Sequence, residues 1–203
     1  MLRAAAARDV PVVLVDERVA RTLGDTETPQ GIVAVVDQPR HRLDELLLRR
    51  PRLLAMMCGV SDPGNAGTVI RTADAAGAEG VVLTRGSTDA YAGKCVRASA
   101  GSLFHLPVIT GVSVVPTVDA LREAGLTVLA TTVHGDPIDE LDDVLAGPVA
   151  WLFGNEAHGL TDDAVAAADR AVRVPIHGRA ESLNLAAAAA VCLYATVRAQ
   201  RAR

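Results

Sequence analysis

Apolar, β-branched runs alternate with helical stretches along most of this chain. The runs that predict buried strands are residues 53–60, 81–84, 104–109, 126–132, 148–154 and 171–176. Amphipathic or alanine-rich stretches between them predict helices at residues 65–78, 91–98, 115–123, 161–168 and 185–200. Strands that are apolar on both faces and separated by helices indicate an α/β fold, in which a mostly parallel sheet carries helices on both faces.

The first part of the chain has a weaker pattern. Residues 10–15 predict a strand that leads into a helix over Asp16–Leu23, and residues 32–37 predict a second strand. Residues 39–51 begin and end near prolines and predict a connecting helix. Two strands and one helix bury little apolar surface, so we expect this part to be the end of a larger domain.

Composition narrows the class of protein. Hydrophobic residues make up 50% of the chain and the net charge is −4, which is ordinary for a globular domain and argues against nucleic-acid binding by bulk electrostatics. No run approaches the roughly 18 apolar residues of a membrane span. The N-terminus has too short an apolar run for a signal peptide, so we expect a cytoplasmic protein.

Cysteine and histidine patterns exclude two further kinds of site. The 3 cysteines are widely spaced without a CxxC pair, and the 5 histidines form no HxxxH or HExxH pattern. We therefore expect neither a disulfide framework nor a metal site.

The cationic residues are nearly all arginine, with Lys94 as the only lysine. Arginine carries a forked guanidinium group that matches phosphate geometry. The densest group predicts a local RNA-facing patch despite the acidic total, and it consists of Arg40, Arg42, Arg49, Arg50 and Arg52.

Loops that follow the predicted strands are the first candidates for a site, because ligands of parallel sheets bind beyond the carboxyl ends of the strands. In residues 61–78, Gly64 and Gly67 permit close backbone approach, Asn65 can cap a helix, and Arg71 follows inside that helix. The alternative is a capped helix with a surface arginine. In residues 151–160, Glu156 lies between glycines at a strand end, where the alternative is a glycine-rich turn.

The third loop, His177–Asn184, leads directly into the alanine-packed final helix. Its polar side chains include Ser182 and Asn184, and the helix has no charged residue before Arg198. A polar loop ahead of an apolar helix indicates a site supported by a buried element. The alternative is that Ser182 or Asn184 only caps the helix.

Together the three loops resemble a known family. DPGNAGTVIRTA, LFGNEAHGL and VPIHGRAESLNLAAAAAVCLY are similar, in this order, to the signature motifs of the SpoU/TrmH ribose 2′-O-methyltransferases of the SPOUT superfamily. The resemblance implies a SPOUT fold with a deep C-terminal trefoil knot and a catalytic domain at residues 51–203. The segment ending in PQGIVAVVD resembles the end of an L30e-like RNA-binding domain, so residues 1–50 are expected to be a remnant of that domain plus a linker.

The resemblance also implies a cofactor and a partner. Family members bind S-adenosylmethionine in the loops of the knot and work as homodimers with the site near the interface. The residues of this chain that match the cofactor-binding positions are Thr131, Gly154, Val174, Ile176 and Leu183.

The implied reaction is methyl transfer to a ribose 2′-hydroxyl of RNA, with 23S rRNA as the expected substrate. The matching catalytic positions are Arg71, Asn65, Glu156, Ser182 and Asn184. Because arginine stays protonated, we expect Arg71 to hold phosphate and polarise the hydroxyl instead of acting as a base. Two alternatives stay open at this point, namely a catalytically idle RNA-binding or ribosome-assembly module of the same fold and a tRNA 2′-O-methyltransferase.

Overall fold

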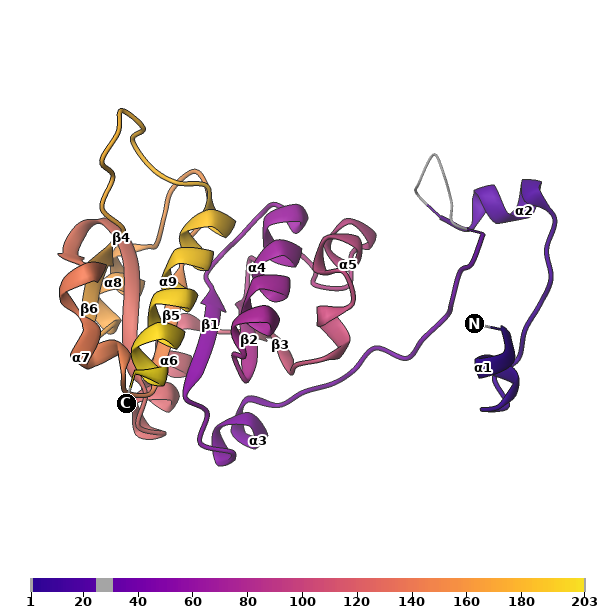
Figure 1. The fold of residues 1–203 in the computed structure, drawn as a ribbon, viewed down its shortest axis with the longest axis horizontal. Helices are drawn as coiled ribbons and strands as arrows, with labels where there is room; N and C mark the ends of the chain where they lie inside the picture. Colours follow the sequence, from indigo (N-terminus) through magenta and orange to yellow (C-terminus); the bar gives the residue numbers. More distant parts are fainter. Residues whose placement is uncertain (1, 25–30, 203) are drawn as a thin grey trace. The chain divides into compact units, whose positions relative to one another are not determined.

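The computed structural model describes residues 2–24 and 31–202, which fall into two compact units, residues 1–38 and 39–203 (Figure 1). Each unit is described by itself. The linker helix α3 (Leu43–Leu48) belongs to the second unit.

The first unit contains two short helices, α1 (Leu2–Ala6) and α2 (Glu17–Thr22). Asp16 caps α2 by accepting a hydrogen bond from Val19 N at 2.8 Å, as expected for an acidic residue at that position. The strands predicted at residues 10–15 and 32–37 are wrong, because the structure has no strand in either segment. None of the described residues of this unit is buried, so the two apolar segments have no core against which a sheet could form.

The second unit is built around a six-stranded sheet in the order β3-β2-β1-β5-β4-β6. Every pairing in it is parallel, which confirms the predicted α/β class. The strands are β1 (Leu53–Met57), β2 (Gly80–Thr84), β3 (Val108–Val112), β4 (Thr127–Pro137), β5 (Val149–Phe153) and β6 (Arg170–Arg173). The third predicted strand is displaced toward the C-terminus, because residues 102–104 form a 3-10 turn and Pro107 precedes β3.

Helices cover both faces of this sheet, and side chains of alternating direction divide the core between them. On β5, Trp151 and Phe153 join the cluster beneath α4 (Pro63–Ala76), α5 (Gly93–Ser99), α7 (Asp142–Leu145) and α9 (Leu185–Arg201). Ala150 and Leu152 join the cluster beneath α3, α6 (Val114–Glu123) and α8 (Asp162–Ala167). The buried indole N–H of Trp151 donates to Thr196 Oγ1 at 2.9 Å and thereby fixes α9 on the sheet.

The strand order creates a switch point at the centre of the sheet. From β1 the chain proceeds outward through β2 to β3, whereas β4 lies on the other side and β5 fills the place beside β1. Loops that leave β1 and β5 therefore diverge at the carboxyl edge, where ligands of open parallel sheets bind. Strand order and pairing do not establish the trefoil knot, which stays a prediction.

Gly67 brings α4 and α5 into direct contact. A Cβ atom at this position would lie 2.4 Å from the carbonyl oxygen of Cys95 and 2.7 Å from Ala98 Cβ. Real carbon atoms do not approach so closely, so the two helices can pack at this distance only around a glycine.

Gly67→Ala is therefore expected to destabilise the protein by a net 1–2 kcal/mol or so, because overpacking of about 1–3 kcal/mol exceeds the gain in helix propensity. Urea unfolding followed by the fluorescence of Trp151, the single tryptophan, measures the change. Gly178→Ala is the matched control, since nothing lies within 4 Å of its new methyl group. Equal unfolding midpoints for the two variants would contradict the packing argument.

Candidate functional site

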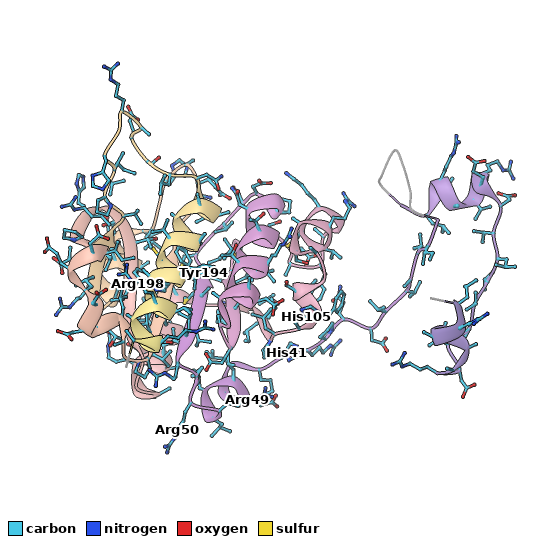
Figure 2. All side chains as sticks on the ribbon, in the orientation of Figure 1. His41, Arg49, Arg50, His105, Tyr194 and Arg198 are labelled. Carbon is cyan, nitrogen blue, oxygen red and sulfur yellow. The ribbon has the colours of Figure 1, made fainter. Side chains whose placement is uncertain are left out.

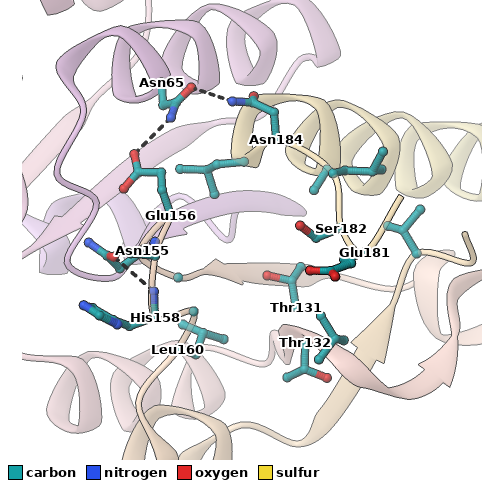
Figure 3. Close-up of a pocket in the computed structure, with 18 of the residues that line it drawn as sticks. Asn65, Thr131, Thr132, Asn155, Glu156, His158, Leu160, Glu181, Ser182 and Asn184 are labelled. Atoms are coloured by element: carbon teal, nitrogen blue, oxygen red, sulfur yellow. Dashed lines mark hydrogen bonds between the residues drawn. The ribbon is translucent and has the colours of Figure 1, made fainter. Parts of the chain in front are cut away.

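A hollow of about 700 Å³ opens at the carboxyl edge of the sheet (Figure 3). It is lined by Asn65 in the first turn of α4, by residues of β4, by the loops after β5 and β6 and by the first turns of α9. Nine of the ten predicted site residues line it, namely Asn65, Thr131, Gly154, Glu156, Val174, Ile176, Ser182, Leu183 and Asn184. These nine residues thus lie around one hollow, and the catalytic and cofactor-binding roles expected for them stay predictions.

Glu156 joins the loop after β5 to the loop after β1. Its Oε1 accepts hydrogen bonds from Asp62 N at 3.2 Å and Asn65 Nδ2 at 3.1 Å. Its Oε2 accepts from the backbone N and the Oγ of Ser61, at 3.2 and 3.1 Å. These four donors leave the carboxylate little capacity for other partners.

The pKa of Glu156 reflects this setting. Partial burial acts to raise it, but the hydrogen bonds from Asn65 and from the backbone of Ser61 and Asp62 favour the charged form. The net result is a pKa below the ordinary value of a glutamate. Glu156 is therefore suited to hold loops as an anion and poorly suited to accept a proton.

Asn65 carries the connection on to the third loop. Its Oδ1 accepts a hydrogen bond from Asn184 Nδ2 at 3.1 Å, while Asn184 Oδ1 accepts from Ala186 N at 2.9 Å and Ala187 N at 3.4 Å. Asn184 is thus the N-cap of α9, which settles the choice between it and Ser182. Figure 3 shows Glu156, Asn65 and Asn184 as one chain of hydrogen bonds along the upper side of the hollow.

The opposite side of the hollow is less connected. Thr131 Oγ1 donates to the carbonyl of Leu152 at 2.8 Å, which ties β4 to β5 at the rim. Ser182, Glu181, Thr131 and Thr132 line the same hollow and are labelled in Figure 3, and the Ser182 side chain has no hydrogen bond within the described chain. Its hydroxyl is available to a ligand.

Gly154 forms part of the floor because a turn folds back over it. Asn155 N donates to the Gly159 carbonyl at 2.9 Å, and Gly159 N donates to the Asn155 carbonyl at 2.8 Å. A Cβ at Gly154 would lie 2.2 Å from the Gly159 carbonyl carbon. A glycine is required here for the turn to close.

Asn155 is a site residue that sequence reasoning did not assign. Its Nδ2 donates to the Gly59 carbonyl at 2.8 Å, and its Oδ1 accepts from Ala157 N at 2.9 Å. An asparagine that bonds the backbone two residues on is a recognisable turn signal, so its local role was predictable. Its bond to the β1 loop was not.

Arg71 is the predicted residue that the structure leaves outside the hollow. It lies on α4, six residues after Asn65, with its side chain exposed. No hydrogen bond or ion pair joins its side chain to any residue of the described chain, and it does not line the hollow. Within a single chain, the described structure therefore does not place the Arg71 side chain beside the other predicted site residues.

Over the residues that it describes, the structure gives no support for a metal site or for a reactive thiol. No group of three or more His, Cys, Asp or Glu side chains in residues 2–24 and 31–202 could hold a metal ion. Burial raises the pKa of the Cys58 and Cys192 thiols to about 12 and that of Cys95 to about 11, so all three stay protonated at neutral pH. Among the described helices, none is long and apolar enough to cross a membrane.

In a comparison with known proteins, two protein-family models match parts of this chain. The SpoU rRNA Methylase family matches residues 52–194. The model described as RNA 2′-O ribose methyltransferase substrate binding matches residues 1–42.

Two curated relatives and one solved structure are similar to this chain. The 23S rRNA (guanosine(2553)-2′-O)-methyltransferase RlmP of Bacillus subtilis is 40% identical over 84% of this chain and 66% of its own length. The 23S rRNA (uridine(2479)-2′-O)-methyltransferase of Streptomyces viridochromogenes is 40% identical over 85% of this chain and 61% of its own length. An AdoMet-bound rRNA methyltransferase from Sinorhizobium meliloti superposes with a TM-score of 0.87 at 35% identity, covering 97% of this chain and 75% of that one. The chain thus spans less than two thirds of the length of both curated relatives.

The lowered pKa of Glu156 predicts how the stability of the protein changes with pH. Because its pKa is lowered in the folded state, its stabilising contribution is present above the ordinary glutamate pKa of 4.5 and is lost as the pH falls through the folded value. Between pH 7 and pH 3.5 or so, the free energy of unfolding should fall less steeply in Glu156→Gln than in the unsubstituted protein. Urea titrations at each pH measure this slope, with the exposed Glu140→Gln as control. Parallel slopes for all three proteins would show that the carboxylate does not link the loops.

Proposed function

The chain belongs to the SpoU rRNA methylase family, and from this we propose that it transfers a methyl group from S-adenosylmethionine to a ribose 2′-hydroxyl of RNA, with 23S rRNA as the substrate. The observation that carries the proposal is the hydrogen-bonded chain from Glu156 through Asn65 to Asn184, which gathers all three motif loops around one hollow. Both curated relatives described above are named as 23S rRNA 2′-O-methyltransferases, and the solved relative is AdoMet-bound.

The hollow fits such a cofactor by its chemistry. Val174, Ile176 and Leu183 supply apolar surface for a planar base, and Gly154 lines the same hollow. Main-chain groups of the surrounding loops can read the edge of the base. When bound, S-adenosylmethionine supplies an already activated methyl group.

The protein's own residues then have to align the ribose and handle one proton. The Ser182 hydroxyl and the Asn184 amide face the hollow and would orient the ribose. Glu156 holds the loops in place and, with its lowered pKa, does not take up the proton. The Arg71 guanidinium would hold a neighbouring phosphate and polarise the hydroxyl, which weakens its O–H bond.

A homodimer is part of the proposal. Arg71 lies outside the hollow of its own chain, on the helix that packs beside α9. The outer face of α9 exposes Val191 (41%) and Tyr194 (51%), a hydrophobic surface that a second copy would cover. Tyr194 is labelled in Figure 2 on this face of α9. A site completed at the dimer interface would bring the exposed arginine into use.

Domain roles follow from the same family membership. We assign residues 51–203 to the methyltransferase domain with its C-terminal knot, and residues 1–50 to part of an L30e-like substrate-binding domain with its linker. The substrate-binding model at residues 1–42 supports the second assignment. A ribosomal RNA substrate places the activity in the cytoplasm.

Arg71→Ala should abolish methyl transfer while leaving the affinity for S-adenosylmethionine within about twofold, because Arg71 acts on the RNA side of the reaction. Tritium transfer to unmodified 23S rRNA measures the first quantity and calorimetry the second. Asn184→Ala should also lose activity, since it removes both the ribose contact and the cap of α9. Wild-type turnover in Arg71→Ala would refute its role, and an unsubstituted protein that binds no cofactor would favour the idle module.

Tyr194→Asp should weaken dimerisation by at least about tenfold, because it places a charge in an apolar interface. Sedimentation velocity across a protein dilution series gives the dissociation constant. Val115→Asp, at an exposed apolar residue of α6 on the opposite face of the sheet from α9, is the control and should leave the constant unchanged. If the unsubstituted protein sediments as a monomer at all concentrations, the homodimer is wrong.

A further inference from the structure

The outer faces of α4 and α5 form one continuous surface beside the hollow. Gly67 lets the helices touch, and a Cβ at Gly64 would lie 3.1 Å from Lys94 Cε. The helices run side by side, and α4 lies between α5 and α9 (Figure 1). A dimer formed through α9 therefore leaves α5 free for another partner.

Helical periodicity selects the residues on this surface. Gly64, Thr68 and Arg71 are spaced i, i+4 and i+7 and share the outer face of α4. Lys94 and Arg97 are spaced i, i+3 on α5, and Lys94 lies over Gly64 on this same side. Small side chains thus form the seam, and cationic side chains project on both sides of it.

The acidic residues near the seam are already engaged. Asp62 accepts a hydrogen bond from Gly64 N at 3.1 Å and pairs with Lys94 Nζ at 2.5 Å. Asp74 pairs with His105 Nδ1 at 2.8 Å. Hydrogen bonds, including those from Lys94 to Asp62 and from Ser102 and His105 to Asp74, hold the pKa of each carboxyl below its ordinary value.

Two guanidinium groups are left without a partner in the described chain. Arg71 and Arg97 are exposed, and neither side chain makes a hydrogen bond or ion pair within residues 2–24 and 31–202. Arg71 lies one turn after Gly67, and Arg97 directly precedes Ala98, which contacts Gly67. The two therefore flank the seam at the same level.

The linker arginines form a weaker candidate. Arg42 is held by Asp44 at 3.0 and 2.7 Å, and Arg52 donates to the Ala146 carbonyl at 2.8 Å. Arg49 and Arg50 precede β1 and so lie at the amino edge of the sheet, opposite to the hollow, as their labels in Figure 2 show. The expected patch is thus partly neutralised and points away from the site.

We propose that the α4/α5 surface binds the phosphate backbone of the RNA that flanks the reacting nucleotide, with Arg97 as the contact additional to Arg71. The proposal rests on the proposed function for the identity of the partner. The forked guanidinium group matches phosphate oxygens, and the contact between the two helices holds Arg71 and Arg97 exposed on either side of it. The surface recognises the charge and the shape of the RNA backbone and does not distinguish one base from another.

Arg97→Gln tests the surface in the full chain. It should raise KM for unmodified 23S rRNA about fivefold to tenfold and leave kcat within about twofold, because it removes binding and no reacting group. The slope of log Kd against log salt concentration should fall by about 0.7–0.9, the value for one lost phosphate contact. Fluorescence anisotropy with a labelled polyuridine oligonucleotide gives Kd. Arg97→Lys should keep the slope, since it retains the charge.

Arg49→Gln is the matched control, because Arg49 is an exposed arginine at the amino edge of the sheet whose side chain has no partner among the residues that the structure describes, and it should change neither quantity. An unchanged salt slope and KM in Arg97→Gln, or equal losses in both variants, would overturn the surface while leaving the methyltransferase standing. If the unsubstituted protein binds the oligonucleotide without methylating rRNA, a weaker binding of Arg97→Gln supports the surface and the proposed reaction fails. Absence of RNA binding by the unsubstituted protein would overturn both.

Discussion

The carboxylate of Glu156 is the interaction on which the site depends. It joins two loops whose contacting residues, Ser61 and Glu156, are 95 residues apart in sequence. Through Asn65, which it also holds, the connection reaches Asn184 and the start of α9. Asn65 and Asn184 each donate one hydrogen bond and accept another, and the carboxylate is the acceptor at the end of the chain, so its loss would leave several polar groups without partners.

Close backbone packing makes this arrangement possible. At Gly154 a turn folds directly onto the end of β5, and at Gly67 two helices touch. Both glycines lie within a few residues of a polar site residue, Glu156 and Asn65 respectively. The hollow is thus bounded by elements that have little freedom to shift, which is what the proposed methyl transfer with its in-line geometry requires.

The sequence predicted what depends on local pattern and burial. Strands such as β5 are apolar on both faces, so their identity and their parallel pairing follow from the residues themselves. The apolar segments at residues 10–15 and 32–37 have the same composition but no buried partner, and no strand forms. The hydrophobic pattern shows that a segment is able to form a strand. The strand forms only where the fold supplies a neighbouring partner for it.

Local sequence patterns could not predict contacts between residues that lie far apart in the chain. The bond from Asn184 to Asn65 spans 119 residues, and only the folded sheet brings them together. Arg71 was assigned to the site because it matches a catalytic position of the family, yet helical geometry directs its side chain and that of Asn65 to different sides of α4. A motif identifies which residues serve one function without requiring that one protomer assemble them.

The double role of Asn184 couples the site to the dynamics of the final helix. Its Oδ1 accepts from the amides of Ala186 and Ala187, and its Nδ2 donates to Asn65. Those two amides can exchange their hydrogens with solvent only when the cap opens, and the same opening strains or breaks the link to Asn65. The exchange rate at the first turn of α9 is therefore a local measure of how often the motif loops separate.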